Sequence, residues 1–285
     1  MSEKKKVFRP IAEDLAAQRA AVKLAISQQV SVAGFPLPIL KGKLNAVVAP
    51  SHSGKTIYSM GLAISLARAG HKIMYLSTEE DYEAFIDKTM SIGEDEAFWN
   101  NISFVYHSEF DQASLAAFMN AVSEQGFEYL VIDYLKKSMW THYSNDHVVM
   151  EEINSTLLRT NAALKNKLGI FTFVQGNRDA FDDKKTDLSM LAADSGKVAL
   201  MIDGGMPVYR SADNILFIKK SGQERILFVA KSRRNNLCLG RSYNYDVDLK
   251  TFEIRMGTSP NVFGEPNVAA KKGNKGPRSK IGGSI

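Results

Sequence analysis

Residues 45–56, NAVVAPSHSGKT, decide the fold of this chain. A short apolar run over 44–48 passes through a tight loop into a Gly-Lys-Thr ending, and an amphipathic segment over 57–69 follows at once. A strand, a loop and a helix in this order turn successive backbone N–H groups and the positive end of the helix towards one point, where a phosphate can bind. The stretch therefore predicts a nucleotide site rather than an ordinary strand-to-helix turn.

The residue types in this loop each suit one part of a magnesium nucleotide. Gly54 lets the backbone approach closely, Lys55 can reach the β- and γ-phosphates, and the Thr56 hydroxyl can hold Mg²⁺. The usual pattern begins with Gly, whereas Ala49 takes that place here. We expect ATP and Mg²⁺ as cofactors, with the nucleotide held by Ala49, Ser51, Ser53, Gly54, Lys55 and Thr56.

The composition suits one α/β domain of about 230 residues with additions at both ends. The chain has 285 residues and a hydrophobic content of 45%, which is ample for a sizeable core. No apolar run reaches the roughly 18 residues of a membrane span, and the first residues lack the apolar stretch of a secretory signal. The single cysteine, Cys238, excludes an internal disulfide framework and fits a reducing cytoplasm. The net charge of +5 permits a nucleic-acid partner without requiring one.

Strands and helices alternate along most of the chain. This pattern predicts a mostly parallel sheet covered by helices on both faces, with antiparallel strands at one edge. The expected strands cover residues 44–48, 72–76, 102–106, 129–132, 170–174, 215–218, 226–231, 243–247 and 251–255. The expected helices cover residues 57–69, 81–92, 112–125 and 148–167.

Three segments are expected along the chain. Residues 1–37 form a basic lead with a helix over 11–30, which either packs on its own domain or docks on a neighbouring subunit. Residues 38–260 form the nucleotide-binding domain. Residues 261–285 form a basic tail rich in Gly, Lys and Ser, whose composition predicts disorder.

Polar residues follow the expected strands at their carboxyl ends, where parallel sheets bind their ligands. Asp133 ends one strand and can hold Mg²⁺ opposite Thr56, although an Asp in this place can also be a turn residue. Glu79 and Glu80 end another strand, where a carboxylate can polarise the attacking water, and they can equally start a helix. Gln175 ends a third strand, where its amide can contact the γ-phosphate.

These motifs together resemble the RecA-like P-loop core of the DnaB-type replicative DNA helicases over residues 38–257. The matched positions are Ala49 at the loop start, Ser77-Thr78-Glu79 for Ser-Leu-Glu, Asp133-Tyr134-Leu135 for Asp-Tyr-Leu, Val174-Gln175-Gly176-Asn177-Arg178 for Ser-Gln-Leu-Asn-Arg, and Lys231-Ser232-Arg233 for Lys-x-Arg. Thr78 and Gly176 replace apolar positions of that pattern. The N-terminal helical domain and fused primase of the family have no counterpart, which suggests a stand-alone phage or plasmid version.

The resemblance implies catalytic roles for four residues. Glu79 rather than Glu80 is then the carboxylate that activates water, and Gln175 senses the γ-phosphate. Lys231 and Arg233 act on the ATP of the adjacent subunit in a homo-hexameric ring, with Arg234 as a competitor for the finger role. The alternative is that these basic residues form a surface cluster with no catalytic role.

The resemblance also implies that two loops line a channel for single-stranded DNA. The first, residues 136–147, combines Lys136 and Lys137 with aromatic residues, and this composition suits phosphate contacts and base stacking. The second, residues 179–210, is expected to be a long, weakly apolar loop, and such loops are often functional. It carries Lys184, Lys185 and Lys197. The alternative for each lysine is a solvated surface loop.

The leading hypothesis is an ATP-dependent replicative DNA helicase, a ring that hydrolyses ATP to translocate on single-stranded DNA and unwind duplex. A primase or a helicase loader is a candidate partner, and no membrane partner is expected. Two alternatives stay open. One is a RecA-like ATPase of recombination or repair, which the Asp-Tyr-Leu element disfavours. The other is an ATP-switched DNA-binding assembly factor that does not unwind DNA.

Overall fold

The computed structural model describes residues 34–37, 39, 41–140, 146–177, 181, 194–203, 205–221, 224–233 and 238–258. The expected helix over 11–30, the tail over 261–285, and the residues Lys184, Lys185 and Arg234 lie outside the described residues. The division of the chain into three segments therefore stays a prediction. No helix in the described part of the chain is long and apolar enough to cross a membrane.

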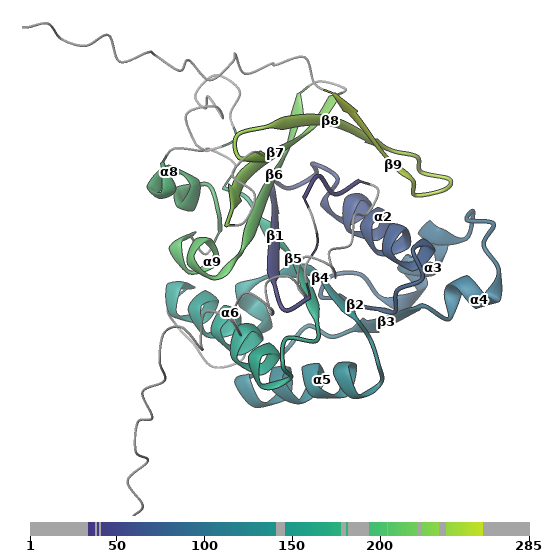
Figure 1. Ribbon diagram of the computed structural model, residues 1–285, viewed down its shortest axis with the longest axis horizontal. Coiled ribbons are helices and arrows are strands. Elements are labelled where there is room, and N and C mark those ends of the chain that lie inside the picture. The colour runs from purple at the N-terminus through teal and green to yellow at the C-terminus, as the bar shows by residue number, and fades with distance from the viewer. Residues whose placement is uncertain are drawn as a thin grey trace, which may run out of the picture.

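One sheet of nine strands forms the centre of the described structure (Figure 1). Its order is β3-β2-β4-β5-β1-β6-β7-β8-β9. The strands are β1 (Leu44–Ala49), β2 (Ile73–Ser77), β3 (Ile102–Tyr106), β4 (Tyr129–Leu135), β5 (Gly169–Gln175), β6 (Asn214–Ser221), β7 (Glu224–Ser232), β8 (Ser242–Val247) and β9 (Ile254–Thr258). From β3 to β6 all neighbours pair in parallel, and β7, β8 and β9 extend one edge antiparallel. This confirms the predicted fold class.

Helices cover both faces of the sheet. They are α2 (Lys55–Arg68), α3 (Tyr82–Thr89), α4 (Glu96–Trp99), α5 (Gln112–Glu124), α6 (Asp146–Ala163), α8 (Ser195–Leu200) and α9 (Gly205–Ser211), with a 3₁₀ turn, η1, at Lys137–Met139. Figure 1 shows α2 and α3 on one side and α5 and α6 on the other. Val47 of β1 enters the core under α2, whereas Ala46 and Val48 enter the core under α5 and α6. Burial on both faces explains why β1 is a nearly continuous apolar run.

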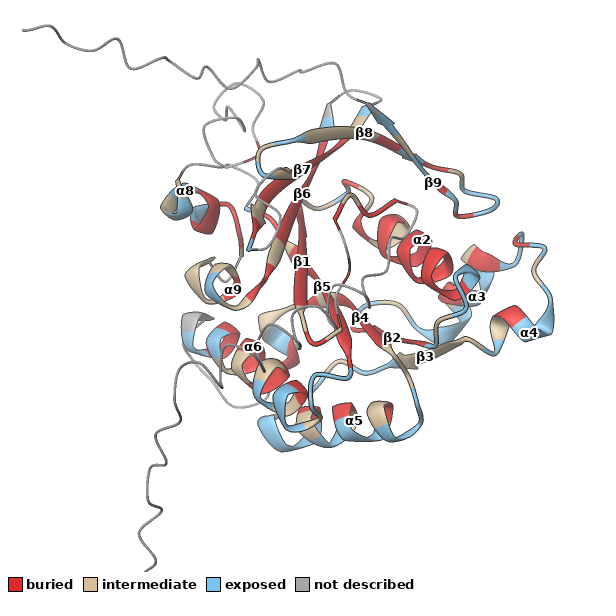
Figure 2. Ribbon diagram, viewed as in Figure 1, coloured by how far each residue is buried: buried red, intermediate tan, exposed pale blue. Residues whose placement is uncertain are grey.

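Helix α2, which begins at Lys55, is buried along most of its length (Figure 2). Strand β9 and the turn before it contact its outer side. Gly61 permits this contact, because a Cβ there would stand 3.0 Å from the Phe252 carbonyl oxygen and 2.9 Å from Ile254 Cγ1. The antiparallel edge of the sheet thus holds α2 in place, and with it the residues at the start of the helix.

The segment over 194–211 differs from the expected weakly apolar loop. It contains α8 and α9, and Val198, Ile202 and Val208 are buried in the core that α6 also enters. Two short helices form here because their few apolar side chains are covered by neighbouring elements that lie far away in sequence.

One helix was not expected, and several element boundaries differ from expectation, among them the end of β4, which continues past Asp133 to Leu135. Helix α4 was not predicted, and it is capped by the Asp95 carboxylate, which accepts the Phe98 N–H at 2.8 Å. The last strand was expected at 251–255 but begins at Ile254. Asp248 accepts the N–H of Thr251 at 3.2 Å, and Phe252 has a positive φ of 54°, so these residues belong to the turn.

Candidate nucleotide-binding site

The phosphate loop (residues 49–56) lies between the carboxyl end of β1 and the start of α2. Gly54 has φ 93° and ψ 25°, in the left-handed region that a side chain disfavours. The Ser53 hydroxyl donates to the Pro50 carbonyl at 2.7 Å and closes the loop on itself. Helix α2 continues directly, with the Tyr58 N–H donating to the Gly54 carbonyl at 3.0 Å. The loop therefore presents the start of a helix to an incoming anion.

Lys55 is buried, and its amine is held at the centre of the site. Its Nζ donates to Gln175 Oε1 at 2.7 Å and lies 4.2 Å from the centre of the Tyr134 ring. Burial lowers the pKa of Lys55, and nearby carboxylates, Asp133 foremost, oppose that shift. A desolvated amine of this kind makes strong charge-assisted hydrogen bonds to phosphate oxygens.

Gln175 joins the phosphate loop to the end of β5. It stands level with Ala49 in the sheet, because β1 and β5 are neighbours. Its amide oxygen accepts from Lys55, and its Nε2 donates to the Ser51 hydroxyl at 3.0 Å. The sequence placed Gln175 beside the γ-phosphate position, and the structure brings its amide to the lysine that would meet that phosphate.

Asp133 lies in β4 with 4% of its surface exposed. Its Oδ2 accepts the Tyr75 hydroxyl at 2.7 Å and the Ser59 hydroxyl at 3.0 Å. Its Oδ1 is buried and accepts no hydrogen bond from any described residue. Burial raises the pKa of Asp133, whereas the surrounding hydroxyls of Tyr75, Ser59 and Thr56 and the charge of Lys55 favour the ionised carboxylate.

These donors fit a magnesium ion. The Asp133 carboxylate, which has one buried oxygen without a partner among the described residues, and the nearby Thr56 hydroxyl offer the hard oxygen ligands that Mg²⁺ prefers. The described residues contain no group of three or more His, Cys, Asp or Glu that could hold a metal by themselves. Mg²⁺ commonly takes one or two protein ligands and completes its shell with phosphate oxygens and water, so Asp133 and Thr56 suffice for a nucleotide-bound ion.

Glu79 faces the same space. A cavity of about 300 Å³ is lined by Ser51, His52, Gly54, Lys55, Thr56, Ile57, Glu79, Lys88, Tyr134 and Gln175. Tyr134 stands beside Glu79, and burial together with that carboxylate raises the pKa of Tyr134 to about 12. Glu80 is not in this lining, and its carboxylate binds Lys88. Of the two acidic residues, Glu79 is the one that meets the cavity.

Lys231 and Arg233 lie away from this cavity. Lys231 is level with Ile215 in the sheet, and its Nζ donates to the carbonyls of Tyr209 and, at 2.7 Å, Ala212. Burial lowers the pKa of Lys231 to about 8. Arg233 is exposed and donates to the carbonyl of Arg210. Both residues stand at the end of the sheet where β1 begins, opposite to the phosphate loop.

The residues predicted to contact DNA differ in their exposure and in their bonding partners. The Lys136 amine donates to the Thr78 carbonyl at 2.7 Å, and Lys197 is exposed on α8. Lys137 pairs with Asp203 at 2.8 Å, so the two predicted DNA loops contact each other. Trp140 is buried, with 6% of its surface exposed. The expectation that aromatic residues of the first loop offer a stacking surface is therefore wrong for Trp140.

Sequence reasoning missed Ser59, Tyr75 and Asp203. Ser59 follows Lys55 by one helical turn, and a serine within an apolar stretch of α2 was a usable signal for a buried polar contact. Tyr75 stands on β2 two residues before the position level with Asp133, which only the strand pairing reveals. Nothing in the local sequence indicated a contact for Asp203, because its neighbours in the fold are distant in sequence.

The sequence matches no protein-family model and no curated protein. Among solved structures, the chain is similar to an ATPase domain, with a TM-score of 0.65, 13% identity, and coverage of 87% of this chain and 99% of that one. It is also similar to a DnaB-like replicative helicase described with its interactions with primase, with a TM-score of 0.63, 14% identity, and coverage of 87% and 67%. A KaiC-like protein, PH0186 of Pyrococcus horikoshii OT3, gives a TM-score of 0.59, 14% identity, and coverage of 81% and 99%. At this identity the likeness shows the fold alone, which is RecA-like.

Proposed function

We propose that this chain is a ring-forming motor that hydrolyses ATP to translocate on single-stranded DNA and to unwind duplex. One observation carries the proposal: a single cavity brings Lys55, Glu79 and Gln175 together, with the Asp133 carboxylate buried beside it. These are the cation, the carboxylate, the amide and the metal ligand of a phosphoryl-transfer site, where catalysis consists mostly of positioning and charge stabilisation.

Each of these residues has a defined task in the proposed reaction. Lys55 binds the β- and γ-phosphate oxygens, and Gln175, whose amide oxygen now accepts from Lys55 and whose Nε2 donates to Ser51, contacts the γ-phosphate once Lys55 has turned to it. Glu79 orients the attacking water and takes up its proton. Asp133 and Thr56 hold Mg²⁺, which neutralises charge on the phosphates when it is bound.

Lys55 and Lys88 line the cavity and Arg225 approaches the loop at Gly54, and we propose that a second copy of the chain supplies a further cation to the γ-phosphate. Arg233 stands level with the start of β1, since its N–H donates to the Asp213 carbonyl and the Asp213 N–H to the Leu44 carbonyl. The phosphate loop begins five residues further along β1, which corresponds to about 17 Å. Arg233 of one copy, supported by Lys231, would therefore act on the nucleotide of its neighbour, as arginine fingers do.

The DNA side of the proposal rests on the contact between the two loops. The Asp203 N–H donates to the Gln175 carbonyl at 2.8 Å, and the Asp203 carboxylate binds Lys137. A change at Gln175 when the γ-phosphate leaves would thus reach both loops. The solved DnaB-like helicase of similar fold is described with primase, and we propose a primase or a loader as a partner of this chain as well.

Two experiments test the motor. The first measures ATP hydrolysis with and without single-stranded DNA, together with displacement of a labelled strand. Stimulation with displacement supports a helicase, stimulation without displacement favours a recombination-type ATPase, and turnover that DNA does not change favours an assembly switch. The second mixes Lys55→Ala with Arg233→Ala. Partial recovery of activity supports a shared site, and no recovery in rings shown to be mixed contradicts it.

A further inference from the structure

The Asp133 carboxylate accepts hydrogen bonds from two side chains at the same oxygen, Oδ2. Tyr75 on β2 and Ser59 on α2 both direct their hydroxyls to Oδ2, at 2.7 Å and 3.0 Å, and the two hydroxyl oxygens lie 2.6 Å apart. Ser59 is 0% exposed, Tyr75 1% and Asp133 4%. The other carboxylate oxygen, Oδ1, is buried and accepts no hydrogen bond within the described residues.

The two hydroxyls differ in how many acceptors compete for their single proton. Tyr75 has one hydroxyl proton, and the negatively charged Oδ2 of Asp133 lies 2.7 Å from its oxygen. Ser59 also has one proton but three acceptors within reach: Oδ2, the Tyr75 oxygen, and the Thr56 carbonyl at 2.8 Å. Tyr75 is therefore the principal donor to the carboxylate, and Ser59 either adds a second bond to Oδ2 or orients the Tyr75 hydroxyl.

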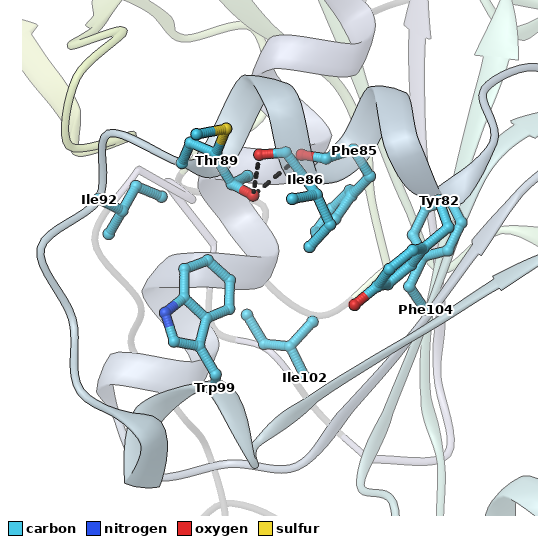
Figure 3. Close-up of a pocket in the computed structure, with 9 residues that line it drawn as sticks. Tyr82, Phe85, Ile86, Thr89, Ile92, Trp99, Ile102 and Phe104 are labelled. Atoms are coloured by element: carbon cyan, nitrogen blue, oxygen red, sulfur yellow. Dashed lines mark hydrogen bonds between the residues drawn. The ribbon is translucent and has the colours of Figure 1, made fainter.

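Both hydroxyls are held before any ligand arrives. The Tyr75 ring stacks on Phe104 at 5.8 Å between centres and lies 5.2 Å from the centre of Phe85. These two rings also line a second cavity, of about 320 Å³, between α3, α4 and β3 (Figure 3). Ser59 is fixed because α2 is buried around it. Neither hydroxyl is needed to fill space, since Phe and Ala would keep nearly the same packing.

We propose that Tyr75 and Ser59 are positioning residues for the metal of the nucleotide site. By binding Oδ2 they turn Oδ1 towards Thr56 and keep it there, so that Asp133 meets Mg²⁺, directly or through a bound water, without first giving up a partner. Groups that orient a metal ligand from behind typically change metal affinity about 10- to 100-fold when they are removed. The inference rests on the proposed function only in its first step, the binding of a magnesium nucleotide.

The test uses Tyr75→Phe, Ser59→Ala and the double variant in the full chain. Each protein is saturated with a fluorescent ATP analogue in EDTA, and Mg²⁺ is then titrated to find its half-saturation point. We expect about a tenfold higher Mg²⁺ requirement for Tyr75→Phe and a smaller increase for Ser59→Ala, because the Tyr75 bond survives in the second. Electron paramagnetic resonance of bound Mn²⁺ should show a broadened signal in the same order.

Tyr129→Phe is the matched control. Tyr129 is also a buried tyrosine of this sheet, and its hydroxyl has no hydrogen-bond partner in the described part of the chain. The control should bind Mg²⁺ as the unaltered protein does, and circular dichroism should show that all variants are folded. Equal Mg²⁺ requirements in Tyr75→Phe, Ser59→Ala and Tyr129→Phe would overturn the inference, as would an equal loss of nucleotide binding in EDTA. Failure of the unaltered protein to bind nucleotide at all would instead refute the proposed function.

Discussion

The ion pair between Asp203 and Lys137 allows a measurement of DNA contact at one named residue. The pair joins the turn before α9 to η1, at 2.8 Å, with 45% of the Asp203 side chain and 27% of the Lys137 side chain exposed. If Lys137 binds a DNA phosphate, Asp203 competes for the same amine. The variant Asp203→Asn removes that competitor and keeps the backbone bond from residue 203 to the Gln175 carbonyl.

The size of the effect follows from the exposure of the pair. Partly exposed ion pairs contribute about 0.2–1 kcal/mol, because water screens them. Removing the Asp203 carboxylate should therefore tighten binding of single-stranded DNA by about 1.4- to 5-fold at constant salt. The dependence of affinity on salt should keep its slope, since the number of phosphate contacts does not change.

Fluorescence anisotropy with a labelled oligothymidine measures this affinity. The control is the same substitution in a Lys137→Ala background. The gain should vanish there, because the amine for which Asp203 and the DNA phosphate compete is absent. A gain of the same size in both backgrounds would mean that Asp203 acts through its charge alone. Unchanged or weaker binding by Asp203→Asn would refute the contact between Lys137 and DNA.

Substitutions at Lys55, Glu79, Glu80 and Trp140 test other parts of the interpretation. Lys55→Ala should abolish ATP hydrolysis, since the loop loses its own cation, and a near-normal rate in a phosphate-release assay would remove the nucleotide assignment. Glu79→Gln should keep ATP binding and lower turnover at least about a hundredfold, the contribution of a positioned base. Glu80→Gln should change turnover much less, and the reverse order would exchange their roles. Trp140→Ala should lower the free energy of unfolding by about 3–5 kcal/mol in a denaturant titration, because it leaves a cavity. A specific loss of DNA affinity in the folded Trp140→Phe variant would instead restore a stacking role.

The layout of the sheet was predictable because a parallel strand covered on both faces is apolar throughout and ends in a polar residue. Gln175, the last residue of β5, follows this rule, whereas the neighbouring strand β4 continues two residues past Asp133 to Leu135. The rule places side chains at one edge of the sheet but says nothing about which of them touch. The hydrogen bond between Lys55 and Gln175 spans 120 positions in the sequence, so no local pattern announces it.

Trp140 shows why local composition led to a wrong prediction of a stacking surface. It follows two lysines and a serine closely, and this setting resembles a nucleic-acid loop. Trp140 is buried in the same core cluster as Phe110, a residue on a distant segment with which it forms an isolated bridge. The helices α8 and α9 were missed for a similar reason, since they are too short for a repeating apolar pattern, and α8 packs on α9 while α9 packs on α6. Tertiary contact overrode local propensity in both places.

Because the phosphate loop and Arg233 lie at opposite ends of the central strands, each molecule in the proposed assembly carries two half-sites that cannot close on each other. An open row of molecules then has one working site fewer than it has members, whereas a closed ring has as many as it has members. The rate per molecule would climb steeply as protein concentration rises and level off once rings form. Dilution alone would therefore stop ATP hydrolysis by such a motor, while every subunit remained folded.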